Sequence, residues 1–523
     1  MEGLIYDDDS KIITVPEKPP HIHEKGLGVM VFETMKINSD QIAQVNMLTG
    51  ESEDYDSLLK RCTIMAVSMR GLDLKEGDMI SICSENTIDC AVPWVAALFQ
   101  NVKISSLDPS LSVEECEHLL EMVESKVVYV SRASTKLIEE VVEKMEKKPK
   151  IVTIPERNDD IYKKETTFAF EPVAVDLKET AVVLFSSGTT GFPKGICWSH
   201  KFLIYFCQHR IFNSCLGYAT MYWASTVFNM VCCLLTGSTK YFAPHVFNPI
   251  AMWNYLKIYT IDYVFLSPYD AINFIKNKPN ADFVPKVQFM AIAGSSISTA
   301  YIKKLKEILP KTLVVNAYGQ TELMSIFSPF HKWNKTKPDS IGIPISGRTY
   351  KIVDTETEKA LGFNEAGEIR VKTEWVMNGY FNLDSSSSWD SEGFLKTGDI
   401  GYYDKDFCFF FVDRIKEMFK YKSWHIVPAK IEAILNKHPS IHLSVVIGVP
   451  HPEDDNHTLA LVQLYEGEHL EEKDVIEYIE DNMDERHKLN AGVKFVTKFP
   501  YTPTSKINRR KLRETTLKDL SCY

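Results

Sequence analysis

The sequence has little cysteine, no long apolar run and no excess of positive charge, and each deficit excludes a class of protein. Eleven cysteines in 523 residues, with no C-x-x-C pair, are too few for a disulfide scaffold. We expect them to be reduced and to pack as small apolar side chains. The most apolar stretch, 222–235, is interrupted by polar residues and is shorter than the ~20 residues of a membrane-spanning helix. It is therefore expected to be a core segment.

The charge balance argues against a nucleic-acid partner. The chain has 59 Lys and Arg against 70 Asp and Glu, a formal net charge of −11, whereas phosphate backbones are bound by clustered positive charge. The acidic stretch at 7–9 is not followed by an apolar run, so no signal peptide is expected. The last residues, 521–523, are not the Ser-Lys-Leu peroxisomal tripeptide. We expect a cytoplasmic protein and leave its oligomeric state open.

Hydrophobic patterning predicts an α/β fold. Short β-branched runs at 79–83, 127–130 and 151–154 are typical of strands, and between them 112–115 predicts a capping box that opens a helix. The spacing over 137–145 is again helical. Alternation of this kind predicts a large multi-layer N-terminal domain with parallel-rich sheets.

A smaller version of the pattern begins after residue 413. It predicts a helix at 429–436, strands at 443–449 and 459–464, and a helix at 473–482. We therefore predict two domains, 1–413 and a small α/β C-terminal lid of 414–523.

The strongest local signal is the segment S-S-G-T-T-G-F-P-K-G at 186–195, which follows the buried-strand pattern of 181–185. Glycines allow the backbone to turn its N–H groups toward an anion, hydroxyl groups add donors, and Lys194 adds a positive charge. The spacing is not that of a Walker A loop. The segment predicts a polyphosphate site; the alternative is a polar turn that carries a lysine.

In the segment 186–195 the sequence resembles the adenylate-forming enzymes, which include acyl-CoA synthetases, 4-coumarate-CoA ligases and beetle luciferases. Three further segments match the family's patterns in its order: 318–322 its aromatic-Gly-x-Thr-Glu, 396–399 its Thr-Gly-Asp, and 413–416 its Asp-Arg-x-Lys. The resemblance spans nearly the whole chain. It implies an enzyme that uses ATP and Mg²⁺ to activate a carboxylic acid as an acyl-AMP, with release of pyrophosphate.

The resemblance also implies roles that fit the chemistry of each residue type. Tyr318 would stack on adenine, Asp399 would accept both ribose hydroxyls, and Arg414 would donate to the same sugar. Thr321 would hold the α-phosphate, and Glu322 would bind Mg²⁺. The implied nucleotide-binding residues are Ser187, Gly188, Thr189, Thr190, Gly191, Lys194, Gly294, Ser295, Ser296, Asn316, Ala317, Tyr318, Gly319, Thr321, Asp399 and Arg414.

Two lysines of the C-terminal part, Lys506 and Lys420, are expected to act in catalysis. Lys506, in 503–507, resembles the lysine of the family's Pro-x-Gly-Lys segment, which bridges the attacking carboxylate and the α-phosphate. A desolvated cation between two anions stabilises their transition state; the alternative is a solvated basic run with 509–511. The family also rotates its C-terminal domain between two half-reactions, with Lys416 at the hinge position and Lys420 at the position that enters the site after rotation.

Several positions depart from the family pattern. Ser423 replaces the glycine beside the pantetheine tunnel of CoA, and Ser505 replaces the glycine before the catalytic lysine. Thr226 falls where beetle luciferases have a histidine that contacts the adenylate, and Phe206 where they have an arginine. We expect a more apolar acid than beetle luciferin. The predicted pocket residues are Phe206, Thr226, Phe228, Cys232 and Ser325, with Thr226 also counted as catalytic; plain core packing is the alternative for Cys232.

Two interpretations share the adenylation step. In the first, CoA takes the acyl group from a fatty or aryl acyl-AMP. In the second, a luciferase-like monooxygenase oxidises the adenylate with O₂. A third, a pseudoenzyme, is disfavoured because Lys194, Glu322, Asp399, Arg414 and Lys506 are all present. A metal enzyme is less favoured still, since 21–23 and 451–457 lack zinc-ligand spacing.

Overall fold

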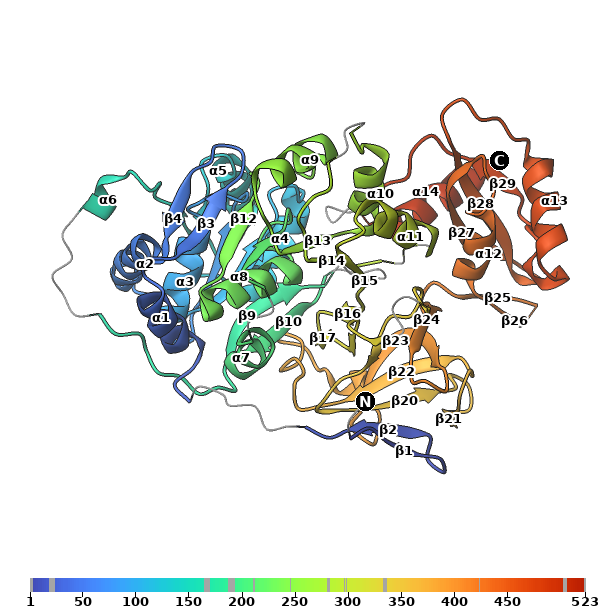
Figure 1. The fold of residues 1–523 in the computed structure, drawn as a ribbon, viewed down its shortest axis with the longest axis horizontal. Coiled ribbons are helices and arrows are strands. Elements are labelled where there is room, and N and C mark those ends of the chain that lie inside the picture. The colour runs from blue at the N-terminus through green and yellow to red at the C-terminus, as the bar shows by residue number, and fades with distance from the viewer. Residues whose placement is uncertain are drawn as a thin grey trace.

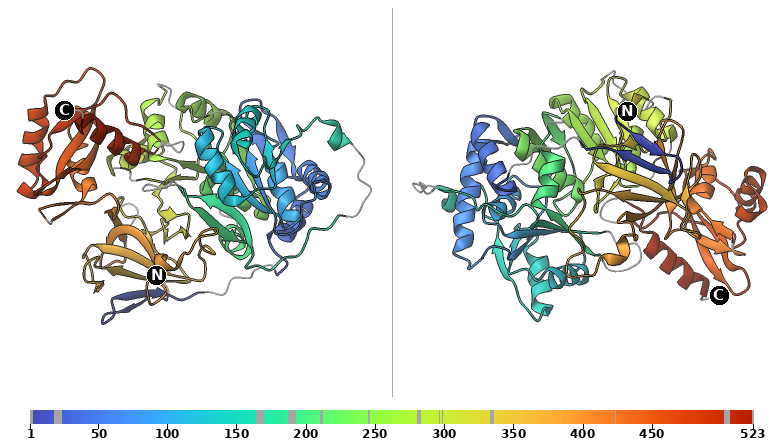
Figure 2. Two further views of the ribbon diagram at one scale, coloured as in Figure 1. Left: turned by 180° about the vertical axis from the view of Figure 1, so that it is seen from behind. Right: turned by 90° about the horizontal axis from the view of Figure 1, so that it is seen from below.

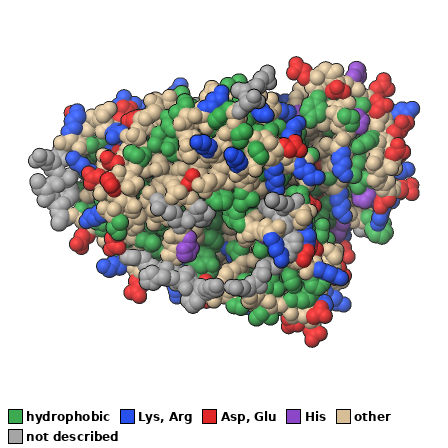
Figure 3. Space-filling model, in the orientation of Figure 1, with side chains coloured by type: hydrophobic (Ala, Val, Ile, Leu, Met, Phe, Trp, Pro, Cys, Tyr) green, Lys and Arg blue, Asp and Glu red, His purple; other side chains and the backbone are tan. Residues whose placement is uncertain are grey.

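The computed structural model describes residues 3–17, 24–163, 170–186, 193–209, 212–244, 246–279, 283–295, 297, 299–332, 336–422, 424–501 and 506–521. Within these ranges no helix is both long and apolar enough to cross a membrane. Lys, Arg, Asp and Glu side chains are mixed over the face shown in Figure 3.

Two sheets with helices packed on them form the part of the molecule at the left of Figure 1. The first sheet has the strand order β10-β9-β6-β5-β7-β8 and is parallel except for β10. Five of its six strands are buried along all or nearly all of their length, as strands covered by helices are, and the exception is the edge strand β8. Its strands are β5 (Met79–Cys83), β6 (Lys103–Leu107), β7 (Val127–Val130), β8 (Lys150–Thr153), β9 (Thr180–Phe185) and β10 (Gly195–Ser199).

The second sheet has the order β15-β14-β13-β11-β12-β3-β4 and is parallel except for β4. Its strands are β3 (Ile42–Asn46), β4 (Ser52–Asp54), β11 (Ser214–Leu216), β12 (Thr239–Phe242), β13 (Tyr263–Leu266), β14 (Phe289–Ile292) and β15 (Leu313–Asn316). The helices of this half are α1 (Leu27–Ile37), α2 (Tyr55–Arg70), α3 (Ala91–Phe99), α4 (Val113–Val123), α5 (Thr135–Lys144), α6 (Asp160–Lys163), α7 (His200–Cys207), α8 (Ala224–Thr236), α9 (Pro249–Ile258), α10 (Pro268–Lys276) and α11 (Thr299–Ile308).

A third, antiparallel sheet joins the two ends of the N-terminal part. β2 pairs with β20, so the blue N-terminal strands lie along the yellow and orange sheet of Figure 1. Its strands are β1 (Ile5–Asp7), β2 (Ile12–Val15), β20 (Arg348–Val353), β21 (Ala360–Leu361), β22 (Gly367–Lys372), β23 (Leu395–Tyr403) and β24 (Phe409–Arg414). Two short hairpins, β16 (Gly319–Gln320) with β17 (Met324–Ser325) and β18 (Phe327–Ser328) with β19 (Ile343–Pro344), lie between the second and third sheets in sequence, and the 3₁₀ turn η2 (Ser386–Ser388) precedes β23.

The C-terminal part lies at one end of the molecule in both views of Figure 2 and has its own core. It contains β25 (Phe419–Tyr421), β26 (Trp424–Ile426), α12 (Pro428–Leu435), β27 (Ile441–His451), β28 (Asp455–Leu464), α13 (Glu472–Asn482), the 3₁₀ turn η3 (Glu485–His487), β29 (Val493–Phe495) and α14 (Arg509–Ser521). β27 runs antiparallel to β28, and β28 parallel to β29.

The predicted α/β fold class, a large N-terminal part with parallel-rich sheets and a small C-terminal α/β part, is confirmed. Locally, the capping box at Ser112 and Glu115 forms at the start of α4, and the apolar run 222–235 is largely the buried helix α8. The ten cysteines of the described residues are buried and form no disulfide among themselves.

Candidate functional site

Six predicted nucleotide-binding residues and both serine departures lie outside the described residues. These are Ser187, Gly188, Thr189, Thr190, Gly191, Ser296, Ser423 and Ser505.

The two ends of the predicted phosphate segment are held together. β9 pairs with β10, the Ser186 N–H donates to the Lys194 carbonyl at 2.9 Å, and the Lys194 N–H donates to the Ser186 hydroxyl at 2.9 Å. The Lys194 ammonium lies 4.6 Å from the centroid of the Tyr380 ring, and the Tyr380 hydroxyl donates to the Glu322 carboxylate at 3.2 Å. The structure therefore brings the segment's cation close to the predicted Mg²⁺ ligand, with Tyr380 between them.

The other predicted nucleotide-binding segments meet at one edge of the second sheet. β14 ends before Gly294 and Ser295, and its neighbour β15 ends at Asn316, so both carboxyl ends open to the same side, where α/β sheets bind ligands. The Ala317 N–H continues the ladder by donating to the Ile292 carbonyl at 2.9 Å. The position after Tyr318 requires glycine, because a Cβ on Gly319 would lie 2.0 Å from the Met324 carbonyl oxygen.

Asp399 is the centre of the polar cluster, and its carboxylate is almost fully buried. The Tyr318 hydroxyl donates to Oδ2 at 2.5 Å, and the Gln320 amide donates to the same oxygen at 2.7 Å. Nε of Arg414 lies 3.2 Å from Oδ1. Burial and the adjacent Asp399 carboxylate raise the pKa of Tyr318, so its hydroxyl stays a donor. The predicted adenine and ribose residues are thus in contact, with both Asp399 oxygens already engaged by side chains.

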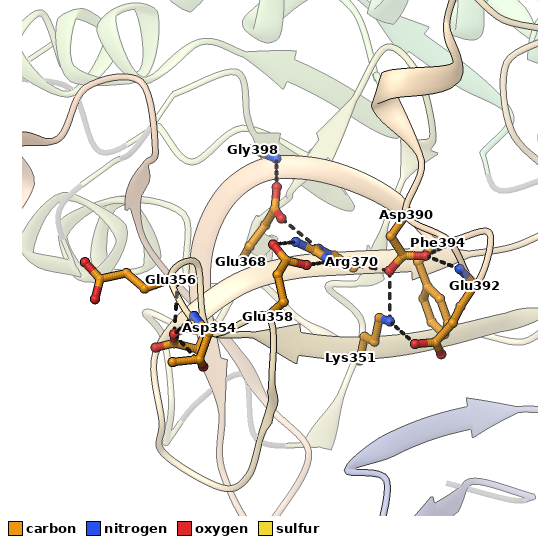
Figure 4. A network of polar contacts seen from close by, with 11 residues as sticks. Lys351, Asp354, Glu356, Glu358, Glu368, Arg370, Asp390, Glu392, Phe394 and Gly398 are labelled. Atoms are coloured by element: carbon orange, nitrogen blue, oxygen red, sulfur yellow. Dashed lines mark hydrogen bonds and ion pairs between the residues drawn. The ribbon is translucent and has the colours of Figure 1, made fainter.

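A largely buried ion network holds the irregular part of β23 at Gly398, next to Asp399 (Figure 4). The Gly398 N–H donates to Glu368 at 3.1 Å, and Nε of Arg370 donates to the other oxygen of the same carboxylate at 2.8 Å. Arg370 also pairs with Glu358 at 2.7 Å and with Asp390 at 3.4 Å. This part of β23 is therefore tied to the nearly buried side chains of Glu368, Arg370 and Asp390.

Lys506 reaches the same place from the C-terminal part. A Cβ on Gly294, whose φ is 102°, would lie 3.1 Å from Cε of Lys506 and 3.7 Å from Nζ. Burial lowers the pKa of Lys506 to about 8; the positive charge of Arg414 acts in the same direction, and Asp399 opposes it. A lysine in this setting is within electrostatic reach of Asp399 and Arg414.

The other two predicted lysines are elsewhere. Lys416 is exposed in a turn in which the Glu417 N–H donates to the Arg414 carbonyl at 3.0 Å. Lys420 is exposed on β25, and its carbonyl accepts a hydrogen bond from the Asn456 side chain at 3.0 Å. The C-terminal part is therefore oriented with Lys506, rather than Lys420, toward Asp399.

The predicted pocket residues divide into buried and half-buried side chains. Thr226 is buried and its hydroxyl donates to the Ala219 carbonyl at 2.9 Å. Cys232 lies in the main core, where burial raises the pKa of its thiol well above the usual value. Phe206 and Phe228 are half-buried at the edge of that core, and the half-buried Ser325 donates to the Phe327 carbonyl at 3.0 Å.

Arg348 was missed by the sequence analysis. It is 1% exposed, and its guanidinium lies 5.5 Å from the centroid of the Phe206 ring. It donates to the carbonyls of Ser325 and Leu323, the latter at 3.3 Å, and forms no ion pair with a carboxylate of the described chain. Burial lowers its pKa. A partial signal was present in the sequence: residue 348 shares one face of β20 with Tyr350 and Ile352, although residues 351 and 353 on the other face are buried as well.

Thr321 was predicted at the α-phosphate and is tied to β10 by its backbone. Its carbonyl accepts a hydrogen bond from the indole N–H of Trp198 at 2.7 Å. Tyr380 and Gln320, which join the predicted residues to one another, gave no signal in the sequence because their partners are distant in the chain.

Known proteins are similar to this chain along nearly its whole length. The AMP-binding enzyme family matches residues 31–381, and the C-terminal domain of AMP-binding enzymes matches residues 430–506. A luciferin 4-monooxygenase of Photuris pensylvanica is 27% identical over 97% of this chain and 98% of its own length. A probable 4-coumarate–CoA ligase of Dictyostelium discoideum is 27% identical over 96% of each chain. The solved structure of a luciferase-like enzyme from the nonluminescent mealworm Zophobas morio is 32% identical, covers 78% of this chain and 100% of its own, and superposes with a TM-score of 0.71.

Proposed function

The chain belongs to the AMP-binding enzyme family and is an adenylate-forming enzyme of the CoA ligase or luciferase type, and from this premise we propose that it activates a fatty or aryl carboxylic acid with ATP and transfers the acyl group to CoA. The observation that carries the proposal is the position of Lys506 against Gly294, close to Asp399 and Arg414.

In the first half-reaction a carboxylate oxygen of the acid forms a bond to the α-phosphorus of ATP. The bond from that phosphorus to the bridging oxygen breaks, and pyrophosphate leaves with the electron pair. Lys506 supplies the positive charge between the two reacting anions, which is worth most in a site that excludes water. Asp399, Tyr318 and Arg414 hold the nucleoside end, and Lys194 with the segment 187–191 holds the departing phosphates.

The Mg²⁺ that the family implies would be held by Glu322. Its carboxylate is half-buried and accepts one hydrogen bond from Tyr380, whose ring also contacts Lys194, so an oxygen ligand lies near the cation that is proposed to hold the phosphates. When bound there, the ion would neutralise charge on the phosphate oxygens.

In the second half-reaction the CoA thiolate attacks the acyl carbon, and AMP leaves. We place the division between two moving parts at 413/414 and the hinge at Lys416, so that rotation withdraws Lys506 and brings in Lys420. The exposed turn at Lys416 and the exposed side chain of Lys420 support this assignment.

The acid is proposed to be apolar at its distal end. Phe206 and Phe228 line the predicted pocket together with Thr226 and Ser325, and Phe206 covers the guanidinium of Arg348. Beetle luciferin is not the expected substrate, because neither the histidine nor the arginine of beetle luciferases is present at 226 and 206.

A second candidate function is a luciferase-like monooxygenase that makes the same adenylate, removes a proton from its α-carbon and adds O₂. The resemblance to luciferin 4-monooxygenases over 97% of the chain supports it.

The test is mass spectrometry of the products that the purified protein makes from Mg-ATP and a panel of fatty and aryl acids, with and without CoA. Acyl-CoA that appears only with CoA supports the ligase. Acyl-adenylate that accumulates in both conditions rejects thioesterification, and O₂ uptake and light emission then test the second candidate. Failure to form acyl-AMP or pyrophosphate from any acid would overturn both.

A further inference from the structure

Two histidines and an aspartate meet at the end of the β27–β28 hairpin. His451 is the last residue of β27, His457 lies in β28, and Asp454 lies in the turn between them. One ligand atom of each lies within 4.8 Å of those of the other two. We expected 451–457 to be a polar loop without a ligand set, because its spacing is not that of a zinc motif. The structure differs in that the segment is not a loop along its whole length: the antiparallel ladder pairs His451 with Asp455 and so places His457 diagonally across on the same face.

The donor atoms lie close together. Nε2 of His457 is 2.9 Å from Oδ2 of Asp454, and Nδ1 of His451 is 3.9 Å from the same oxygen. The two imidazole rings stack with centroids 3.8 Å apart. Donors bound to tetrahedral Zn²⁺ at about 2.1 Å lie roughly 3.4 Å apart, which is near the two distances to Asp454. Because the two rings are nearly parallel, at 11° to each other, one imidazole must rotate before both nitrogens point at the same ion. The side chains of His451, Asp454 and His457 are 34%, 23% and 24% exposed, which leaves a path for an ion from solvent.

We propose that His451, Asp454 and His457 bind a divalent transition-metal ion such as Zn²⁺, with water in the remaining coordination position. Two imidazoles and a carboxylate form a donor set that Zn²⁺ accepts in proteins, whereas Mg²⁺ takes oxygen ligands and keeps its waters. The site is therefore separate in chemistry and in place from Glu322.

Other polar groups contact the cluster, and a bound ion would have to displace some of these contacts. The N–H groups of Glu453 and Asp454 donate to Nδ1 of His451 at 3.4 and 3.2 Å. The Lys422 ammonium lies 4.0 Å from Oδ1 of Asp454. A bound dication replaces the two N–H contacts and repels Lys422, so binding is expected to loosen Lys422 from the turn.

The same turn supports the hairpin that carries Lys420. The Lys422 N–H donates to the Asp454 carbonyl at 3.0 Å, and the Asn456 side chain donates to the Lys420 carbonyl at 3.0 Å. A metal ion at Asp454 therefore acts directly on the segment proposed to serve the second half-reaction. This consequence rests on the proposed function, whereas the metal site itself does not.

Titration calorimetry with Zn²⁺, without nucleotide or Mg²⁺, tests the site. It should be done in a His21→Gln/His23→Gln background, so that the N-terminal histidines cannot contribute. We expect one ion per chain, with affinity at least about 10-fold lower in His457→Gln and Asp454→Asn. The matched control His469→Gln, an exposed histidine of the same part, should bind like the parent, and Lys422→Gln should bind more tightly because a competing cation is gone. Equal affinity in the parent and in His457→Gln, or no binding at 100-fold excess of metal, would overturn the site.

Separate assays of the two half-reactions test the consequence. Zn²⁺ is expected to slow thioester formation from supplied acyl-AMP about fivefold and to leave pyrophosphate release unchanged, with no effect in His457→Gln. An equal effect in His457→Gln, or none in the parent, would overturn the coupling. If no acyl-AMP chemistry is found at all, the proposed function fails, while the calorimetric result for the metal site stands.

Discussion

The pKa of Lys506 is lower than that of an ordinary lysine. Its side chain lies where the carboxylate and the α-phosphate are proposed to react. Its pKa of about 8 lies close to neutral pH, because burial and Arg414 outweigh Asp399. The ammonium is present below that pKa and is lost above it. Adenylation measured as kcat/KM, which reports the free enzyme, is therefore expected to fall as pH rises through about 8. A pH profile of pyrophosphate release checks this.

Two variants separate this explanation from a general effect of pH. Lys506→Ala should lower adenylation by about 10²–10³-fold while ATP still binds. Lys506→Arg should lose the alkaline decline in whatever activity it retains, because a guanidinium stays charged. An alkaline decline of the same midpoint in Lys506→Arg would assign it to another group.

Arg348 limits which side chains residue 206 can carry. A guanidinium already lies beneath residue 206, so a second one there would be a buried like charge. Phe206→Arg is expected to lower the free energy of unfolding by about 2–4 kcal/mol. Urea unfolding midpoints of the variant and of Phe206→Leu, which changes size without charge, measure the effect.

The double variant Phe206→Arg/Arg348→Met completes the cycle. If repulsion is the cause, Phe206→Arg should cost at least about 1 kcal/mol less when residue 348 is Met. Additive costs would mean that steric misfit, not charge, destabilises Phe206→Arg.

Secondary-structure elements divide into those that local sequence predicts and those that it does not. β5 and α4 were predicted because burial periodicity and a capping box are encoded within a few residues. The pairing of β2 with β20 joins residues over 330 positions apart and leaves no local trace. The same reasoning holds at the site: the motif residues were found by resemblance, whereas Tyr380 and Arg348 depend on contacts that only the folded chain creates.

The ion network between β22 and the turn before β23 is expected to stabilise the third sheet. Arg370 is nearly buried and pairs with the nearly buried carboxylate of Glu368 at 2.8 Å, whereas Asp390 also pairs with Lys351 at 2.8 Å, so removal of Arg370 leaves the buried charge of Glu368 without its ion pair. Arg370→Leu should lower the free energy of unfolding by about 3–5 kcal/mol. Lys147→Leu, which breaks an exposed pair with Glu124, should cost less than about 1 kcal/mol.

Arg370→Leu should also weaken ATP binding, because Glu368 holds the backbone next to Asp399. Denaturation curves and nucleotide titrations of the two variants measure both effects. Similar losses of stability in both would show that the network acts as ordinary surface charge.

The orientation of the two parts is supported by contacts on both sides of the boundary. Nζ of Lys276 lies 3.3 Å from His442, and the rings of Tyr269 and Tyr501 have centroids 4.9 Å apart. Between them lies an open cleft of about 530 Å³, whose lining includes Tyr301 and Lys304. Among the described residues these contacts join polar and aromatic side chains, which fits an interface between parts that are proposed to rotate.

If the C-terminal part alternates between two orientations, substitutions of Lys506 and of Lys420 must impair different half-reactions. Lys506→Ala should lose pyrophosphate release but still convert supplied acyl-AMP, because Lys506 lies against Gly294 only in the present orientation. Lys420→Ala should release pyrophosphate normally and slow the second step by about 10-fold or more, because Lys420 is exposed here and acts only after rotation.

Lys416→Pro, at the proposed hinge, should impair the second step like Lys420→Ala, since proline removes the backbone freedom that rotation needs. If Lys420→Ala and Lys506→Ala lost the same half-reaction, one fixed orientation would suffice for both steps, and Lys416 would be an ordinary turn residue.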